Sequence, residues 1–306
     1  MDSPGRAELV IVGAGPAGVS GALWARTLGI EPRVIEQAAE VGGQLGLVHF
    51  HPAELPGIAR GNGPELAAIY AGQLEAAGIR AELGVEAQSL EPSARGVAVR
   101  VAGGRIEAAA ALVATGLRRR RLLVPGEAAL AGAGVSYSAR RDRDRFANRD
   151  VVVVGGGDGA YENALLLTAA GCRVLIVVRG RPRARAEFRA RVAADPAIEV
   201  MEQARVVEIL GAGEVEAVRI DHRGSLVTRA ARGVVIKIGM APNSEWCSNL
   251  ARDAGGYLEV DARGRTSAPR VWAAGDVARP LRPSVAAAVG GGAIALADIR
   301  AALRGE

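Results

Sequence analysis

Apolar runs alternate with glycine-rich turns along much of the chain. Residues 8–36 begin with the apolar run LVIV, pass through a glycine turn into a helix-like stretch, and end in the apolar run RVIE. This order predicts a strand, a turn, a helix and a second strand. Residues 150–179 repeat it, with VVVV before their turn and VLIVV after their helix. We therefore expect an α/β fold with two nested Rossmann-like dinucleotide-binding domains.

The first glycine turn, GAGPAG, has Gly13, Gly15 and Gly18 in the spacing GxGxxG. The first glycine permits the tight turn, the second lets a pyrophosphate approach the backbone, and the third lets the helix pack on the sheet. The helix N-terminus offers unpaired N–H groups and partial positive charge to phosphates. Glu36 ends the next strand, where a carboxylate can bond both hydroxyls of an adenosine ribose. Together these features predict a dinucleotide site.

The second glycine turn, GGGDGA, carries Gly155, Gly157 and Ala160, but its second strand ends in Val178 and Arg179 instead of an acid. A carboxylate would repel a ribose phosphate, whereas arginine can hold one with its planar fork of donors. The sequence thus favours NADPH over NADH at this turn, and NADH remains possible.

A third segment, residues 270–299, predicts a strand that ends at Gly275 and Asp276, followed by a long helix of small residues. An acid that bonds a ribityl chain or a phosphate, with a helix packed tightly behind it, explains both features.

Composition narrows the classes of function. The 306 residues are 49% hydrophobic, enough for about two domains, and the formal net charge is +5, with Lys237 the only lysine. An anionic ligand or partner is therefore conceivable, but 3% aromatic residues argue against nucleic-acid binding by base stacking. Cys172 and Cys247 form no CxxC pair, so neither a metal site nor a disulfide framework is expected. With no apolar run of membrane-span length and no room for a signal peptide, we expect a cytoplasmic protein without a membrane partner.

Seven motifs, in this order and spacing, resemble those of the low-molecular-weight thioredoxin reductases of the pyridine nucleotide-disulfide oxidoreductase superfamily. They are GAGPAG at 13–18, VIE and GGQL within 34–45, ATG at 114–116, GGGDGA at 155–160, IGMAPN at 238–243 and AAGDV at 273–277. The resemblance implies an FAD domain built from residues 1–117 and 243–306. An NAD(P)H domain, 118–242, is inserted between them, and we expect a homodimer.

The resemblance also implies which residues bind each cofactor. For FAD they are Gly13, Gly15, Pro16, Ala17, Gly18, Glu36, Gln37, Gly43, Gln44, Leu45, Ala114, Thr115, Gly116, Gly275, Asp276, Arg282, Pro283 and Ser284. For NADPH, or NADH, they are Gly155, Gly157, Asp158, Gly159 and Arg179. The resemblance implies that Asp276 holds the ribityl chain. It also implies that the helix that starts near Arg282 closes over the flavin.

The chain departs from this family where the reactive thiols belong. Family members carry GVSxCATCDG, which aligns without a gap with GVSYSARRDR at 134–143, so Ser138 and Arg141 replace the two cysteines. Asp142 stands in the place of the acid that protonates the reactive thiol. Disulfide exchange needs a thiolate, so we expect no ordinary thioredoxin reductase activity. We expect Cys172 and Cys247 to be buried structural thiols.

Three alternative functions remain, which differ in the electron acceptor. The first is an acidic one-electron carrier such as ferredoxin or flavodoxin, steered by the arginines within 118–121 and 140–145. The second is a small organic substrate oxidised directly by the flavin, with oxygen as final acceptor and His49, His51 or Asp142 as the catalytic proton acceptor. The third is a non-catalytic flavin or nucleotide redox sensor. Our expectation is an FAD-dependent NAD(P)H oxidoreductase whose acceptor is not a disulfide of its own chain.

Overall fold

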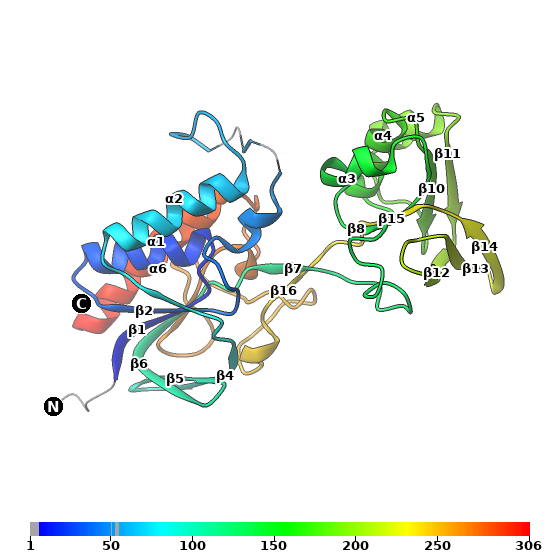
Figure 1. Ribbon diagram of the computed structural model, residues 1–306. Helices are drawn as coiled ribbons and strands as arrows, with labels where there is room; N and C mark the ends of the chain where they lie inside the picture. The colour runs from blue at the N-terminus through cyan, green and yellow to red at the C-terminus, as the bar shows by residue number, and fades with distance from the viewer. Residues whose placement is uncertain (1–5, 50, 53–54) are drawn as a thin grey trace. The chain divides into compact units, whose positions relative to one another are not determined.

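The chain forms two compact units in the computed structural model, which describes residues 6–49, 51–52 and 55–306. Unit 1 comprises Met1–Arg118 and Ala241–Glu306, and unit 2 comprises Arg119–Met240 (Figure 1). Each unit contains a mainly parallel sheet with a glycine turn between its first strand and first helix. The expected α/β class with two nested Rossmann-like domains is confirmed.

Unit 1 is built on one seven-stranded sheet with the order β3-β2-β1-β6-β5-β4, in which β17 also pairs with β6. The strands β1, β2, β3, β6 and β17 are parallel, whereas β4 and β5 form an antiparallel extension. The strands are β1 Ala7–Val12, β2 Pro32–Glu36, β3 Ala81–Leu83, β4 Ala87–Ser93, β5 Gly96–Val101, β6 Gly104–Val113 and β17 Val271–Ala273.

The described residues of unit 1 also form three α-helices and three 3-10 helices. They are α1 Pro16–Thr27, η1 Gly43–Leu47, α2 Gly63–Ala76, η2 Glu245–Cys247, η3 Asp276–Ala278 and α6 Val285–Arg304. The small residues of α6 let it pack closely on α1: a Cβ on Gly292 would lie 2.4 Å from the carbonyl oxygen of Ala17.

Helix α6 corrects one expectation from the sequence. By length and composition alone it is apolar enough to cross a membrane, although no apolar run of that length was expected. Its residues Ala295, Leu296 and Ile299 are fully buried in the core of unit 1, and Asp298 bonds to Trp272 and Arg265. These contacts place α6 as a core helix of the folded unit.

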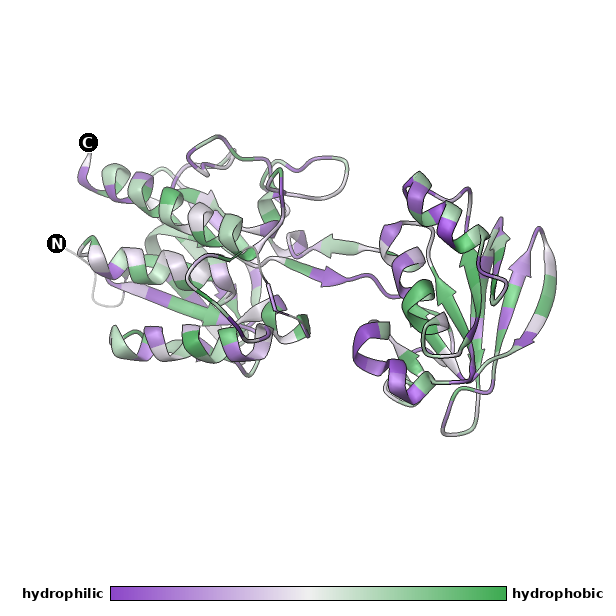
Figure 2. Cartoon of the chain, turned by 90° about the horizontal axis from the view of Figure 1, so that it is seen from above, coloured by the Kyte–Doolittle hydropathy of each residue, from purple (hydrophilic) through white to green (hydrophobic). Residues whose placement is uncertain are grey.

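Unit 2 contains a five-stranded parallel sheet, β11-β10-β9-β15-β8, and a three-stranded antiparallel sheet, β12-β13-β14. The strands at the centre of the parallel sheet are coloured hydrophobic in Figure 2, and they are almost wholly buried. The elements are β8 Val135–Ser136, α3 Ala139–Phe146, β9 Asp150–Val154, α4 Asp158–Thr168, β10 Arg173–Val178, α5 Ala186–Ala193, β11 Ile198–Glu202, β12 Ala204–Leu210, β13 Ala217–His222, β14 Ser225–Ala230 and β15 Gly233–Ile236.

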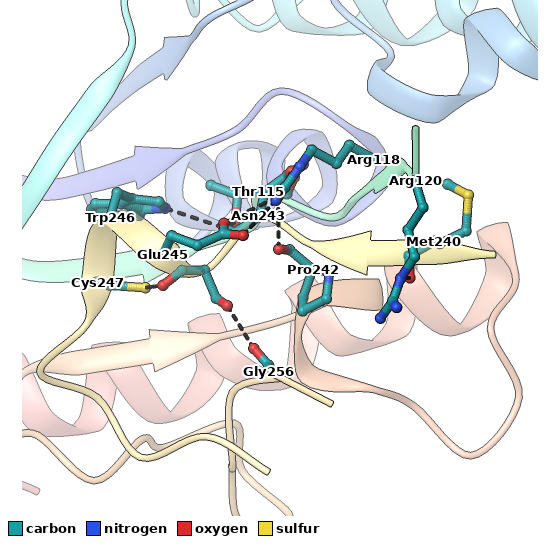
Figure 3. Close-up of polar contacts among 11 residues, drawn as sticks. Thr115, Arg118, Arg120, Met240, Pro242, Asn243, Glu245, Trp246, Cys247 and Gly256 are labelled. Atoms are coloured by element: carbon teal, nitrogen blue, oxygen red, sulfur yellow. Dashed lines mark hydrogen bonds and ion pairs between the residues drawn. The ribbon is translucent and has the colours of Figure 1, made fainter. Parts of the chain in front are cut away.

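The chain passes between the units through β7 Leu117–Arg119 and β16 Met240–Pro242, which pair as a two-stranded sheet. Figure 3 shows the side chains around these segments. The first crossing brings Arg118 next to the segment that follows the second crossing, and this pairing contributes to the site described below.

Candidate functional site

The glycine turn of unit 1 lies between β1 and α1 and tolerates almost no side chain. Gly13 has φ +107°, and a Cβ on it would lie 2.5 Å from the carbonyl oxygen of Ala114. A Cβ on Gly18 would overlap the carbonyl of Gly13. A Cβ on Gly15, by contrast, would meet nothing within 4 Å, so Gly15 faces open space at the start of α1.

Helix α1 has no side-chain cap on its first N–H groups, whereas Asn62, Ser138 and Ser284 cap α2, α3 and α6. Pro16 occupies the first helical position, where its missing N–H costs nothing. The free N–H groups and the open space above Gly15 fit an external anion, as a dinucleotide pyrophosphate requires.

Glu36 ends β2 beside this turn and is 8% exposed. Its Oε2 accepts a hydrogen bond from the N–H of Ala14 at 2.7 Å, and its Oε1 accepts one from the N–H of Ala38 at 2.8 Å. The two backbone donors fix the carboxylate at the sheet edge. Each oxygen keeps a second lone pair, which leaves the group able to accept bonds from ribose hydroxyls.

A cavity of about 320 Å³ opens in front of the turn and Glu36. Gly13, Glu36, Gln37 and Thr115, all expected from the sequence, line it together with nine further residues. Those nine are Val12, Ile35, Val85, Glu86, Ala87, Arg118, Asn243, Glu245 and Trp246. Its position and size are those that an adenosine group next to the turn would need.

Four of the nine further residues, Arg118, Asn243, Glu245 and Trp246, lie in or directly after the two crossings (Figure 3). Thr115 donates its hydroxyl to the carbonyl of Asn243 at 2.6 Å, and the Asn243 amide donates back to the carbonyl of Thr115 at 2.8 Å. Arg118 donates to the Asn243 side chain at 3.0 Å and pairs with Glu245. Asn243 lies in the motif IGMAPN, which was the one signal in the sequence that pointed to it.

A second cluster lies where the flavin ring is expected from the resemblance. Gln44 donates its amide to Asp276 at 3.1 Å, and a Cβ on Gly116 would lie 3.4 Å from the same amide. Burial raises the pKa of Asp276, and the hydrogen bond from Gln44 lowers it by less. A Cβ on Gly43 would lie 3.2 Å from Gly15, so the loop passes close to the glycine turn. The structure therefore gathers these positions at one edge of the sheet.

Other residues expected to bind FAD differ in burial and in their contacts. Leu45 is buried, and a Cβ on Gly275 would lie 2.9 Å from the Cβ of Ala17. Ser284 accepts a bond from the N–H of Ala287 and thus caps α6. Arg282 and Pro283 are exposed at the start of that helix.

In unit 2 the glycine turn lies at the point where the strand order reverses, because β10 and β15 flank β9 on opposite sides. Such a switch point is where ligands bind in parallel α/β sheets. Gly155 has φ +144°, and its Cβ would lie 2.3 Å from the carbonyl oxygen of Lys237; Gly157 is open. Helix α4 also lacks a side-chain cap.

The acid of this turn is already paired. Asp158 accepts from the N–H and the guanidinium of Arg185, both at 2.7 Å, and these bonds lower its pKa. The carbonyl of Gly159 accepts a bond from the Asn163 amide at 2.6 Å, which ties this residue to the next turn of α4. Arg179 is exposed at the end of β10, and its guanidinium has no hydrogen bond or ion pair with any residue that the structure describes.

The positions of the missing thiols have become structural. Ser138 accepts a bond from the N–H of Arg141 at 3.4 Å and caps α3. Arg141 holds Asp142 with two bonds, at 2.9 and 2.7 Å, and Asp142 also accepts from Ser136. Burial opposes ionisation of Asp142, but these bonds and the charges of Arg141 and Arg145 outweigh it, so its pKa is lowered. A carboxylate held in this way is a poor proton acceptor.

The two candidate histidines differ in their contacts. The Nδ1 of His51 lies 3.0 Å from the carbonyl oxygen of Gly61. The Nε2 of His49 is buried and has no hydrogen-bond partner among the described residues. Of the two, His49 therefore has the ring nitrogen that a ligand could satisfy. Phe50, between them, lies outside the described residues.

Both cysteines are buried and free, as expected. The thiol of Cys172 donates to the carbonyl of Phe146, and that of Cys247 to the carbonyl of Ser244. Burial raises the pKa of both, that of Cys247 to about 12. Within residues 6–49, 51–52 and 55–306, no group of three or more His, Cys, Asp or Glu side chains could hold a metal ion.

The two glycine turns, the acid after β2 and the arginine after β10 define a two-dinucleotide oxidoreductase fold. The pyridine nucleotide-disulphide oxidoreductase family matches residues 7–294, and the chain belongs to this family. A thioredoxin reductase of Streptomyces coelicolor is 35% identical over 300 residues, with 95% of this chain and 92% of the relative covered. Members of this kind use FAD and NADPH.

Two further comparisons agree. An alkyl hydroperoxide reductase component from Pseudomonas putida is 33% identical over 294 residues, which cover 94% of this chain and 56% of that protein's length. The crystal structure of Lactococcus lactis thioredoxin reductase superposes with a TM-score of 0.80 at 28% identity, covering 98% of this chain and all of the other. The chain thus spans only about half of the alkyl hydroperoxide reductase component and nearly all of these two thioredoxin reductases.

Proposed function

We propose that the protein is an FAD-dependent NADPH oxidoreductase that passes electrons to an acceptor other than a disulfide of its own chain. The observation that carries this proposal is that the two positions of the family's reactive cysteines hold other residues with structural contacts: Ser138 caps a helix, and Arg141 is bound to Asp142. The two cysteines present are buried and have raised pKa values. Disulfide exchange needs an accessible thiolate, and these groups do not provide one.

The residues of unit 1 fit FAD. The uncapped start of α1 and the open space at Gly15 suit the pyrophosphate, and Glu36, fixed by two backbone donors, suits the adenosine ribose. Gln44 and Asp276 suit the ribityl and ring end. When bound, the flavin supplies two-electron chemistry with a reduced nicotinamide.

The residues of unit 2 fit the electron donor. Gly155, Gly157 and the uncapped α4 suit the dinucleotide pyrophosphate, and Asp158 is neutralised there by Arg185. Arg179 is exposed without a partner among the described residues, which supports its role as the group that holds a 2′-phosphate. The donor is therefore NADPH in preference to NADH.

The acceptor we favour is a small molecule. Most of the arginines that could steer an acidic carrier protein are engaged within the chain: Arg118 with Glu245, Arg120 with the carbonyl of Met240, Arg141 with Asp142 and Arg143 with Asp144. Helix α3 is strongly hydrophilic (Figure 2), and its two acids pair with two of its four arginines, Asp142 with Arg141 and Asp144 with Arg143. These pairings within the chain reduce the positive charge that could steer an acidic carrier.

A second candidate function is direct oxidation of an organic substrate by the flavin. The buried, unpartnered Nε2 of His49 supports it, because a neutral imidazole nitrogen can take a proton from a substrate. In this function His49 is the proton acceptor in preference to His51 or Asp142. Replacing His49 by Asn lowers turnover of such a substrate, whereas the same change at His222 in β13 leaves it unchanged.

We further propose a cytoplasmic homodimer, in line with the thioredoxin reductases that the chain resembles. Sedimentation of the FAD-loaded protein tests the dimer; a monomer at micromolar concentration would contradict it.

The central experiment is anaerobic mixing of the purified yellow protein with NADPH and, separately, with NADH. We expect bleaching of the flavin absorbance by NADPH, steady turnover with an artificial acceptor, and no reduction of thioredoxin at the rate of a thioredoxin reductase. Arg179→Ala weakens NADPH selectively, by about 1–3 kcal/mol for a lost charged hydrogen bond. Arg191→Ala on α5 is the matched control. Protein that takes up no FAD, or that reduces thioredoxin efficiently, refutes the proposal.

A further inference from the structure

Lys237 lies directly at the ligand edge of unit 2. It follows β15, and its N–H donates to the carbonyl of Val154 at the end of β9 at 2.8 Å. A Cβ on Gly159 would lie 3.4 Å from the Cε of Lys237, so the side chain lies beside the first turn of α4. The only lysine of the chain thus lies at the switch point of the sheet, next to the glycine turn.

A second cation, Arg119, belongs to the neighbouring segment, because the N–H of Arg120 donates to the carbonyl of Gly239 at 3.0 Å, two residues after Lys237. Arg119 stacks over the ring of Tyr137, with its Cζ 5.8 Å from the ring centre. Neither the Lys237 ammonium nor the Arg119 guanidinium forms a hydrogen bond or ion pair with the described part of the chain. Both side chains are partly buried, so the charged form of each is destabilised by lost hydration, and no bonded carboxylate compensates for this loss.

The charges around the pair add to this cost. Burial lowers the pKa of Lys237, and the charge of Arg119 lowers it further, against a smaller opposite effect of Glu162. Burial and the charge of Arg141 lower the pKa of Arg119, while Tyr137 and Asp142 raise it. A bound anion would relieve the repulsion between the two cations.

Two acids of this part of unit 2 are bonded to other residues. Asp158 is bound by Arg185, and Asp142 is bound by Arg141 and Ser136. Glu162 is exposed on α4 and influences Lys237 only through its charge. The two cations therefore form a site suited to an anion from outside the chain.

We propose that Lys237 Nζ and the Arg119 guanidinium bind the diphosphate bridge of the nicotinamide dinucleotide. This inference rests on the proposed function, which places that dinucleotide at the turn. The diphosphate fits better than the 2′-phosphate, because Arg179 follows β10 on one side of β9 and Lys237 follows β15 on the other. The two cationic positions thus serve different phosphates.

The first test compares Lys237→Met with Arg179→Ala in equilibrium binding of NADPH, NADH and ADP-ribose to the FAD-loaded protein. We expect Lys237→Met to weaken all three ligands by a similar factor, roughly tenfold or more, since all share the diphosphate. Arg179→Ala should weaken NADPH alone. Lys237→Arg, which keeps the charge, should retain most of the affinity.

Two outcomes overturn the inference: affinities of Lys237→Met equal to those of the wild type, or a loss confined to NADPH. Wild-type protein that binds FAD but none of the three ligands would instead refute the NADPH part of the proposed function. Unchanged FAD content and unfolding temperature in the Lys237→Met protein show that its fold is intact.

A second test needs no variant. Because the chain has one lysine, an amine-reactive reagent followed by peptide mass spectrometry reports Lys237 separately from the N-terminus. We expect NADH and ADP-ribose to slow the labelling of Lys237, and adenosine, which lacks the diphosphate, to leave it unchanged. Equal labelling rates with and without saturating ADP-ribose would overturn the inference.

Discussion

Glu36→Gln tests the adenosine end of the proposed FAD site. The two carboxylate oxygens of Glu36 accept from the N–H groups of Ala14 and Ala38, and the side chain is almost fully buried. Glutamine has one acceptor oxygen and one amide donor. One of the two backbone N–H groups must therefore face a donor instead of an acceptor.

The magnitude follows from these two bonds. A buried donor left without its partner costs about 1–3 kcal/mol, and the apo protein should lose this much stability. The bound ribose would lose part of a charge-assisted contact as well, for a further weakening of FAD binding of about 1–3 kcal/mol. FAD affinity should thus fall roughly 5- to 150-fold, since every 1.4 kcal/mol is a factor of ten.

Glu86→Gln is the matched control. Glu86 lines the same cavity, but it is exposed, and the backbone donors of Ala14 and Ala38 bond to Glu36 and not to it. Urea unfolding of the apo protein gives the loss of stability, and quenching of FAD fluorescence on titration gives the affinity. If Glu36→Gln and Glu86→Gln bind FAD equally well, the assignment of Glu36 to the ribose is wrong.

Three other outcomes follow from contacts in the two units. Gly292→Ala should destabilise unit 1 by about 1–3 kcal/mol, because the added Cβ would lie 2.4 Å from the backbone of α1. Gly290→Ala on the same helix meets open space and should raise the free energy of unfolding by up to about 1 kcal/mol. Equal unfolding midpoints of the two variants would contradict the packing of α6 on α1. Hydrogen bonds from Arg265 lower the pKa of Asp298 most, so its ionised form stabilises the fold at neutral pH and this stabilisation is lost as the pH falls below the ordinary value of about 4. Asp298→Asn should accordingly be less stable than the wild type in urea at pH 7, with the difference closing in acid; a difference independent of pH would refute this. Replacing both Cys172 and Cys247 by Ser should leave NADPH-driven dye reduction per bound FAD unchanged, because both thiols are buried and bonded to carbonyls; a loss of turnover at full FAD content would show that a thiol takes part.

The sequence predicted the parts of the fold and site that depend on local geometry. The spacing of Gly13, Gly15 and Gly18 reports contacts within one strand, turn and helix, so the turn could be located from a short stretch of neighbouring positions. Cys172 and Cys247 were correctly expected to be buried: free cysteine is among the most buried residue types, and Cys172 directly precedes an interior strand of unit 2.

The sequence did not reveal contacts made between distant segments. Arg118 meets Asn243 and Glu245 only because β7 and β16 pair, and no local pattern encodes that pairing. Likewise Lys237 comes next to Gly159 through the parallel pairing of β15 with β9. Its status as the only lysine was a visible signal in the sequence, but its position beside the glycine turn required the fold.

The two glycine turns differ in the charge at the end of the strand that follows their helix, although both are proposed to bind a dinucleotide. In unit 1 the acid at the end of the second strand, Glu36, accepts from the backbone of Ala14 in the glycine turn and of Ala38, which leaves lone pairs for hydroxyl groups. In unit 2 the corresponding position is Arg179, and the single acid of the turn is cancelled by Arg185. With Lys237 and Arg119 added, unit 2 offers positive charge on both sides of β9, which suits a ligand that carries phosphate at both its ribose and its bridge. This difference in charge between two similar turns is the strongest physical reason to assign NADPH, and not a second FAD, to unit 2.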